Sequence, residues 1–239
     1  GVLDSPAAGT RTIVNTNTLA ISDGSGIASN YTLTNGTLTM TIVPRPTTVS
    51  GTKTYDGTTN VASSNLSSFT NLAGSDTLSL SGTGTISSAD VGTGKTVNTS
   101  GLTIDNSSGV GSNYTLSAAT VNVTERVIGL SGVRAFDGTN NASSADLSIS
   151  NLVSGENLTL SGSGTVPNAT VEMNKAITLV SLSIADGSGG KSSNYTLTGG
   201  SHTLDISQLS VNVTGSRQYD GTKTVNSSDL NLTNLVSGE

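Results

Sequence analysis

Lys53-Thr54-Tyr55-Asp56-Gly57 occurs in three related copies along the chain. The other two copies are Arg134-Ala135-Phe136-Asp137-Gly138 and Arg217-Gln218-Tyr219-Asp220-Gly221, at spacings of 81 and 83 residues. In each copy a basic residue and an aromatic ring alternate with polar residues, as in a half-buried strand. The Asp-Gly step then predicts a turn, because glycine accepts a positive φ and aspartate bonds its own backbone. The copies therefore define a repeat of about 82 residues.

Two further motifs recur in the same order. Ser29-Asn30-Tyr31-Thr32-Leu33 returns at residues 112–116 and 193–197. Asn71-Leu72 followed by Gly74 returns as Asn151–Glu156 and Asn234–Glu239. The motifs divide the chain into the second half of a repeat, two complete repeats and the first half of a repeat, at residues 1–46, 47–126, 127–208 and 209–239. We therefore expect the chain to be cut from a longer array of repeats.

The length of the repeat and its residue types predict the fold class. Solenoid coils have roughly 20 to 45 residues, so this repeat is long enough for a small autonomous β-domain. The chain has 39 Ser, 38 Thr and 29 Gly, which disfavours long helices, and apolar residues alternate with polar ones in short runs. We predict an all-β chain of tandem small β-sandwich repeats, immunoglobulin-like in type. β-Grasp-like units and a continuous β-helix are the alternatives.

Six of the seven aromatic residues occupy two recurring positions. We predict that these rings fill the core of each repeat, because large rings dominate core energetics where Ser and Thr cannot fill space. With the Asp-Gly turns they form the predicted set of structural residues: Tyr31, Tyr55, Tyr114, Phe136, Tyr195, Tyr219, Asp56, Gly57, Asp137, Gly138, Asp220 and Gly221. An aromatic surface that binds glycans is the functional alternative.

Composition excludes several function classes. A net charge of −6 and a pI near 4.6 oppose nucleic-acid binding, which needs a basic face. No apolar run approaches the roughly 18 residues of a membrane span, so we expect no membrane insertion. The chain has no cysteine and one histidine, His202, which leaves a serine nucleophile without an obvious base. We expect no catalytic residues, no enzyme activity and no cofactor.

Calcium is the one metal that the sequence suggests. Three loops rich in Asp, Ser and Gly begin at Asp23, Asp105 and Asp186, and calcium prefers carboxylate and carbonyl oxygens. Each loop supplies one carboxylate, however, and turn formation accounts for the same residues. We therefore predict no metal site, with these loops as the only calcium candidates.

The ordered motifs resemble the YDG/MBG repeats of large secreted bacterial surface proteins, including filamentous-haemagglutinin-like adhesins exported by two-partner secretion. The resemblance covers both complete and both partial repeats, and it rests on Lys53–Gly57, Asn71–Asp76, Val91–Val97 and Ser112–Leu116. Phe136 in place of Tyr and Val171–Ile177 in place of the third motif are departures from the pattern.

The resemblance implies an extracellular location, on the bacterial surface or secreted, and no active site. We expect a structural stalk of an adhesin, in which β-domains form a rod for cell-surface attachment or biofilm. Its partners would be neighbouring repeats; in the alternative, the repeats bind carbohydrate or a host or matrix protein. Residues 1–46 and 209–239 together amount to nearly one repeat, which suggests that the tail of one molecule completes the head of another.

Overall fold

The structure is a computed structural model that describes residues 1–34 and 36–238. Its regular elements are β-strands and 3-10 turns of three residues, and the described part of the chain contains no α-helix. No helix within that part is long and apolar enough to span a membrane. The chain divides at Thr124 and Glu125 into two compact units, which are described separately. Glu239, the last residue of the third Asn-Leu motif, lies outside the described residues.

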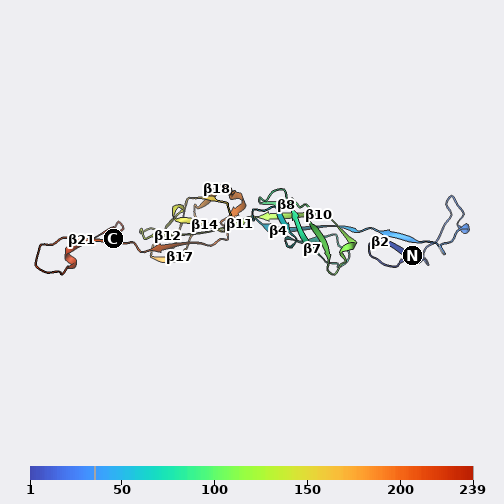
Figure 1. Ribbon diagram of the computed structural model, residues 1–239, viewed down its shortest axis with the longest axis horizontal. Coiled ribbons are helices and arrows are strands. Elements are labelled where there is room, and N and C mark those ends of the chain that lie inside the picture. The colour runs from blue at the N-terminus through green and yellow to red at the C-terminus, as the bar shows by residue number, and fades with distance from the viewer. Residues whose placement is uncertain (35, 239) are drawn as a thin grey trace. The chain divides into compact units, whose positions relative to one another are not determined.

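The first complete repeat is a sandwich of two sheets (Figure 1). The first sheet has the order β6-β4-β10-β8. Its strands are β4 (Arg45–Thr54), β6 (Leu66–Thr70), β8 (Gly92–Thr96) and β10 (Tyr114–Thr124). The second sheet has the order β5-β7-β9, with β5 (Asn60–Ala62), β7 (Leu78–Thr85) and β9 (Leu102–Asn106). The 3-10 turns η2 (Ser63–Asn65) and η3 (Gly111–Asn113) precede β6 and β10.

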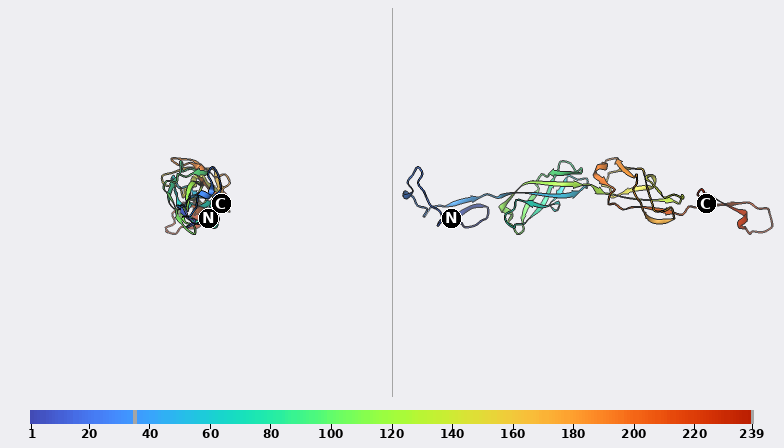
Figure 2. Two further views of the ribbon diagram at one scale, coloured as in Figure 1. Left: turned by 90° about the vertical axis from the view of Figure 1, so that its right-hand side faces the viewer. Right: turned by 180° about the vertical axis from the view of Figure 1, so that it is seen from behind.

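The first and last strands of the repeat lie side by side in parallel at the centre of the larger sheet (Figure 2). The register places Val49 opposite Ala119, Gly51 opposite Val121 and Lys53 opposite Val123. Side chains of β4 alternate between buried and exposed positions, as the period of two along a strand requires. The pairing closes the two ends of the repeat onto each other, so both halves are needed to form one sheet.

The second complete repeat has the same strand order in its larger sheet, β14-β12-β20-β17. These strands are β12 (Gly129–Ala135), β14 (Leu147–Ser150), β17 (Glu172–Ala176) and β20 (His202–Ser207). The remaining strands form three pairs: β11 (Arg126–Val127) with β19 (Tyr195–Thr196), β13 (Asn141–Ser143) with β16 (Ser163–Thr165), and β15 (Leu158–Ser161) with β18 (Ser183–Asp186). Two 3-10 turns complete it, η4 (Ser144–Asp146) and η5 (Ser192–Asn194). The all-β prediction and the sandwich repeats are confirmed.

The partial repeats form smaller sheets. Residues 1–42 contain the 3-10 turn η1 (Ala28–Asn30) and the sheet β1-β2-β3, made of β1 (Val2–Leu3), β2 (Gly9–Asn15) and β3 (Thr39–Ile42). The C-terminal part contains η6 (Ser227–Asp229) and the pair β21 (Asn212–Gly215) and β22 (Leu230–Thr233). All buried hydrophobic side chains of the described residues belong to the segment from Val49 to Ile206. A core therefore forms only where both halves of a repeat are present.

One recurring glycine allows a close approach of backbone to backbone. A Cβ atom on Gly51 would lie 1.7 Å from the carbonyl oxygen of Asn65, and one on Gly132 would lie 1.9 Å from that of Asp146. These carbonyls belong to the 3-10 turns that precede β6 and β14. Any side chain here would push the turn away from the first strand of the repeat.

Candidate functional site

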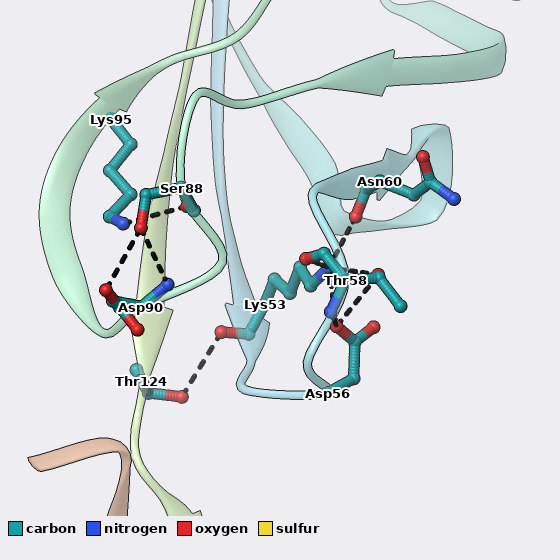
Figure 3. A network of polar contacts seen from close by, with 8 residues as sticks. All are labelled: Lys53, Asp56, Thr58, Asn60, Ser88, Asp90, Lys95 and Thr124. Atoms are coloured by element: carbon teal, nitrogen blue, oxygen red, sulfur yellow. Dashed lines mark hydrogen bonds and ion pairs between the residues drawn. The ribbon is translucent and has the colours of Figure 1, made fainter. Parts of the chain in front are cut away.

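The recurring motifs build two polar clusters in each complete repeat. The first, here called the basic cluster, is formed in repeat 1 by Lys53, Asp56, Thr58 and Asn60 (Figure 3). The Lys53 Nζ atom lies 2.8 Å from Asp56 Oδ1 and donates to the carbonyl oxygens of Thr58 at 2.9 Å and Asn60 at 2.5 Å. Lys53 is almost fully buried. Its ammonium group therefore holds the chain after the Asp-Gly turn against β4.

Arginine takes the same place in the other two copies. Arg134 is buried, pairs with Asp137 and donates from Nη2 to the Thr139 carbonyl oxygen at 2.6 Å. Arg217 in the C-terminal partial repeat pairs with Asp220 and donates to the Thr222 carbonyl oxygen at 2.6 Å. Both residue types thus pair with the turn aspartate and donate to the threonine carbonyl oxygen that follows the turn.

The aspartate of the cluster also forms the turn. Asp56 Oδ1 accepts from the Thr58 backbone N–H and hydroxyl, each at 2.9 Å, and Gly57 has φ of 76°. Asp137 with Gly138 and Asp220 with Gly221 repeat this arrangement. The Asp-Gly residues thus lie at the turns where they were predicted.

The electrostatics of the turn favour the ionised carboxylate. Burial alone would raise the pKa of Asp56, but the hydrogen bonds from Lys53 and Thr58 outweigh it, so the pKa lies below its usual value. For Asp137, burial is likewise outweighed by hydrogen bonds from Thr139 and Arg134, and its pKa is also lowered.

The second cluster, here called the tyrosine cluster, joins the Asn-Tyr-Thr motif to the Asn-Leu motif. The Tyr114 hydroxyl donates to Asp76 Oδ2 and accepts from the Ala73 backbone N–H at 3.1 Å. In repeat 2 the Tyr195 hydroxyl donates to Glu156 Oε2 at 2.7 Å and accepts from Val153 N–H at 3.1 Å. Each tyrosine, at the start of β10 or β19, therefore joins its strand to the turn that follows β6 or β14.

The sequence showed both motifs but not their pairing. The carboxylate that accepts the hydrogen bond lies 38 residues before Tyr114 and 39 before Tyr195. This nearly constant spacing is the feature of the sequence from which the pairing of the two motifs could have been predicted.

The hydrogen bond to Asp76 raises the pKa of Tyr114, since it stabilises the protonated hydroxyl. Burial, followed by the hydrogen bond to Glu156, raises the pKa of Tyr195. Both tyrosines therefore remain neutral donors beyond the ordinary tyrosine range.

The first residue of the Asn-Leu motif has its own role. Asn71, Asn151 and Asn234 adopt positive φ angles of 59°, 66° and 66°. Their side-chain amides donate to the carbonyl oxygens of Pro46, Val127 and Ser210 at 2.6 to 2.7 Å. Asparagine tolerates the left-handed conformation better than most residues, so the motif both turns the chain and holds the segment that enters the repeat.

The aromatic positions differ between complete and partial repeats. Tyr55, Tyr114 and Tyr195 are buried, and Phe136 is half-buried. Tyr31 and Tyr219 are exposed, so the prediction of a core position is wrong for these two rings. The physical reason is that each lies in half a repeat, where the opposite half that would cover the ring is missing.

Two of the three calcium candidates, Asp23 and Asp186, bond the backbone of the loop that follows them. Asp23 Oδ1 accepts from Ala28 N–H at 2.5 Å, and Asp186 Oδ1 accepts from Ser192 N–H at 2.8 Å. In repeat 1 the equivalent acceptor is Asn106, which bonds Gly111 N–H at 2.7 Å, and Asp105 precedes it in β9. The described residues include no group of three or more His, Asp or Glu side chains that could hold a metal ion.

His202 lies half-buried at the start of β20. Its Nε2 atom lies 2.8 Å from the Leu197 carbonyl oxygen, which makes this nitrogen the donor. This hydrogen bond stabilises the turn between Tyr195 and β20.

Together the geometry defines a tandem repeat protein of small β-sandwiches, in which recurring polar residues bond within each repeat. A family model, the YDG domain, matches residues 37–122 and 124–204. The chain belongs to the YDG domain family. Neither a curated protein nor a solved structure matches it.

Proposed function

We propose that the chain is a structural stalk or spacer segment of an extracellular bacterial adhesin, whose tandem β-domains form a rod for surface attachment or biofilm. The proposal rests on one observation: the recurring polar residues bond to each other within the repeat. Lys53 with Asp56 and Tyr114 with Asp76 are bonded to each other inside the repeat. Residues that recur to bind a ligand would instead have to present free polar groups or rings to solvent.

The connections between repeats also support a spacer. Only Glu125 separates β10 from β11, and only Val43 and Pro44 separate β3 from β4. Connections this short have little slack, and Pro44 and Pro46 restrict φ at the earlier one. The acidic net charge and the exposed Ser and Thr side chains suit a hydrated surface outside the cell.

The alternative, in which the repeats bind carbohydrate or a matrix protein, needs aromatic rings that face solvent. In the complete repeats Tyr55, Tyr114 and Tyr195 are buried. The stalk is therefore the function that the geometry supports best.

Small-angle X-ray scattering of chains with two, three and four complete repeats tests the proposal. A spacer should increase its maximum dimension by the same increment for each added repeat. The radius of gyration of a compact globule grows roughly with the 0.38 power of chain length. Growth of that kind would contradict the proposal. Binding of the same chains to a panel of glycans and matrix proteins, with the affinity rising with repeat number, would favour the alternative.

A further inference from the structure

The first and last strands of each complete repeat carry the two ends of that repeat. In repeat 1 the chain enters β4 at Arg45 and leaves β10 at Thr124, and the two strands run parallel. Arg45 lies opposite Tyr114 at one end of the ladder, and Thr124 lies opposite Thr54 at the other end. The repeat is therefore entered and left at opposite ends of one ladder of paired strands.

Repeat 2 has the same arrangement. The chain enters β11 at Arg126 and leaves β20 at Ser207. Strands β12 and β20 pair in parallel over six residue pairs, the first of which is Leu130 with His202. The short strands β11 and β19 also pair in parallel, ahead of them in the chain. The parallel ladder is thus a property of both complete repeats and does not involve the partial ones.

Tension along the chain would load this ladder in shear. A pull toward the N-terminus on Arg45 and toward the C-terminus on Thr124 drives β4 and β10 past each other along their common direction. The hydrogen bonds of the ladder then resist together, because the bonds of a parallel pair are evenly spaced along both strands and no pair can separate before the others. A pull on two facing residues would instead open the pairs one after another.

The position of the ladder in the sheet adds resistance to sliding. Strands β4 and β10 are flanked by β6 and β8, so both outer edges of their ladder are covered. The inner face of the ladder carries Val49, Val121 and Val123, each at most 2% exposed. Sliding would bring these side chains into water, which costs free energy in addition to the broken hydrogen bonds.

Hydroxyl groups add further bonds between the two strands. Ser117 Oγ, at an irregularity of the register, donates to the Thr47 carbonyl oxygen at 2.9 Å. In repeat 2, Ser207 Oγ donates to the Arg134 carbonyl oxygen at 3.2 Å. These bonds join the last strand directly to the first, so they have to break when the strands slide.

We propose that each complete repeat is a force-bearing module, in which the parallel ladder of the first and last strands is a mechanical clamp. The load passes from one end of the repeat to the other through this ladder. In repeat 1, residues 55–113 lie between the two strands in the sequence and carry no load until the clamp fails. The clamp follows from the strand order alone, whereas its use in a stalk under tension rests on the proposed function.

Constant-force tweezers on the full 239-residue chain test the clamp by the direction of the pull. The chain has no cysteine of its own, so handles attach only at introduced cysteines. Thr48→Cys with Thr124→Cys shears the ladder of repeat 1, whereas Thr54→Cys with Thr124→Cys places the handles on facing residues and opens the ladder pair by pair. All three positions are exposed.

We expect the sheared repeat to survive about tenfold longer or more than the opened one at the same force, because several hydrogen bonds must break together. Unfolding in shear should also release the whole repeat in a single step. Equal lifetimes in the two directions, or a shorter lifetime in shear, would overturn the proposal.

A matched pair of hydroxyl variants, made in the Thr48→Cys and Thr124→Cys background, tests which sheet carries the load. Ser117→Ala removes a bond across the clamp. Ser79→Ala removes a bond between β7 and β9, where Ser79 Oγ donates to the Asn106 carbonyl oxygen at 3.2 Å; both serines are exposed. Ser117→Ala should unfold about two- to tenfold faster under force, and Ser79→Ala should stay within about twofold of the unsubstituted rate. Equal effects of the two variants would place the load outside the clamp and overturn the proposal.

The force and scattering measurements can fail separately. A chain that grows compactly in scattering but resists shear would keep the clamp and contradict the stalk. A chain whose length grows by equal increments, but which unfolds in shear as easily as in opening, would keep the stalk and contradict the clamp.

Discussion

At the scale of single residues, the recurring positions are explained by contacts within the repeat. Tyr114 joins two segments that are far apart in the sequence, through one donated and one accepted hydrogen bond. Gly51 is required because the Asn65 carbonyl oxygen occupies the space of a side chain. Neither role requires a ligand, so substitutions at these positions should change stability rather than binding.

Tyr114→Phe should lower the free energy of unfolding of the first complete repeat by about 1–3 kcal/mol. The ring still fills its place, but the Ala73 N–H loses an acceptor and Asp76 loses a donor. Urea denaturation measures the loss. Tyr31→Phe is the matched control: the side chain is exposed, and the change should stay within about 0.5 kcal/mol. Equal effects of the two variants would show that the hydroxyl bonds contribute nothing.

Gly51→Ala should destabilise the same repeat by about 3 kcal/mol or more. The added Cβ would lie 1.7 Å from a backbone oxygen, so the strand and the 3-10 turn would have to separate. Circular dichroism during thermal unfolding measures the shift. Ser50→Ala in the same strand is exposed and should leave the midpoint nearly unchanged. A stable Gly51→Ala protein would mean that the turn can move at little cost.

At the scale of elements, the Asp-Gly turn and the strand before it form one polar unit. The basic residue of β4 or β12 reaches over the turn, and the aspartate caps the backbone inside it. Because the Lys53 and Arg134 stems are buried while their partner carboxylates are partly exposed, the unit joins the core of the repeat to its surface.

Lys53→Arg should change the free energy of unfolding by less than about 1 kcal/mol, because Arg134 makes the same aspartate pair and the same bond to the threonine carbonyl oxygen in repeat 2. Lys53→Met should cost about 1–3 kcal/mol, since the Thr58 and Asn60 carbonyl oxygens would lose their donor. Chemical denaturation of both variants gives the comparison. If Lys53→Met is as stable as Lys53→Arg, the charge and its hydrogen bonds are not needed.

The pH dependence of stability follows from the turn aspartates and the tyrosine clusters. The pKa values of Asp56 and Asp137 are lowered. Their stabilisation is complete above the unfolded aspartate pKa of about 3.9 and is lost as the pH falls through the folded pKa. The pKa values of Tyr114 and Tyr195 are raised. Their stabilisation is complete below about pH 10 and is lost as the pH rises through the folded pKa.

Urea midpoints measured from pH 2 to 12 should therefore form a plateau with an acid and an alkaline decline. Asp56→Asn should reduce the steepness of the acid decline, and Tyr114→Phe that of the alkaline decline. An unchanged profile in either variant would contradict the assigned cause.

At the scale of the whole molecule, each complete repeat has its own core and its own sheets. Every strand ladder among residues 1–34 and 36–238 joins strands of the same compact unit. Proteins built in this way unfold as a series of units whose stabilities are approximately separate.

Calorimetry should therefore resolve two main unfolding transitions when one repeat is weakened. Gly51→Ala should lower the transition of the first complete repeat, and Gly132→Ala that of the second, while the other transition stays in place. A single transition that moves as a whole in both variants would show that the repeats fold as one cooperative unit.

The repeat, the β-sandwich class and the Asp-Gly turns could all be predicted from the amino-acid sequence. These features depend on local chemistry: the alternation of polar and apolar residues, the spacing of the motifs and the backbone freedom of glycine. The tertiary structure alone decided which motifs meet. It paired Tyr114 with Asp76 and β4 with β10, and it left Tyr31 and Tyr219 uncovered. Such contacts join residues tens of positions apart, and burial depends on whether the opposite half of the repeat is there to exclude water.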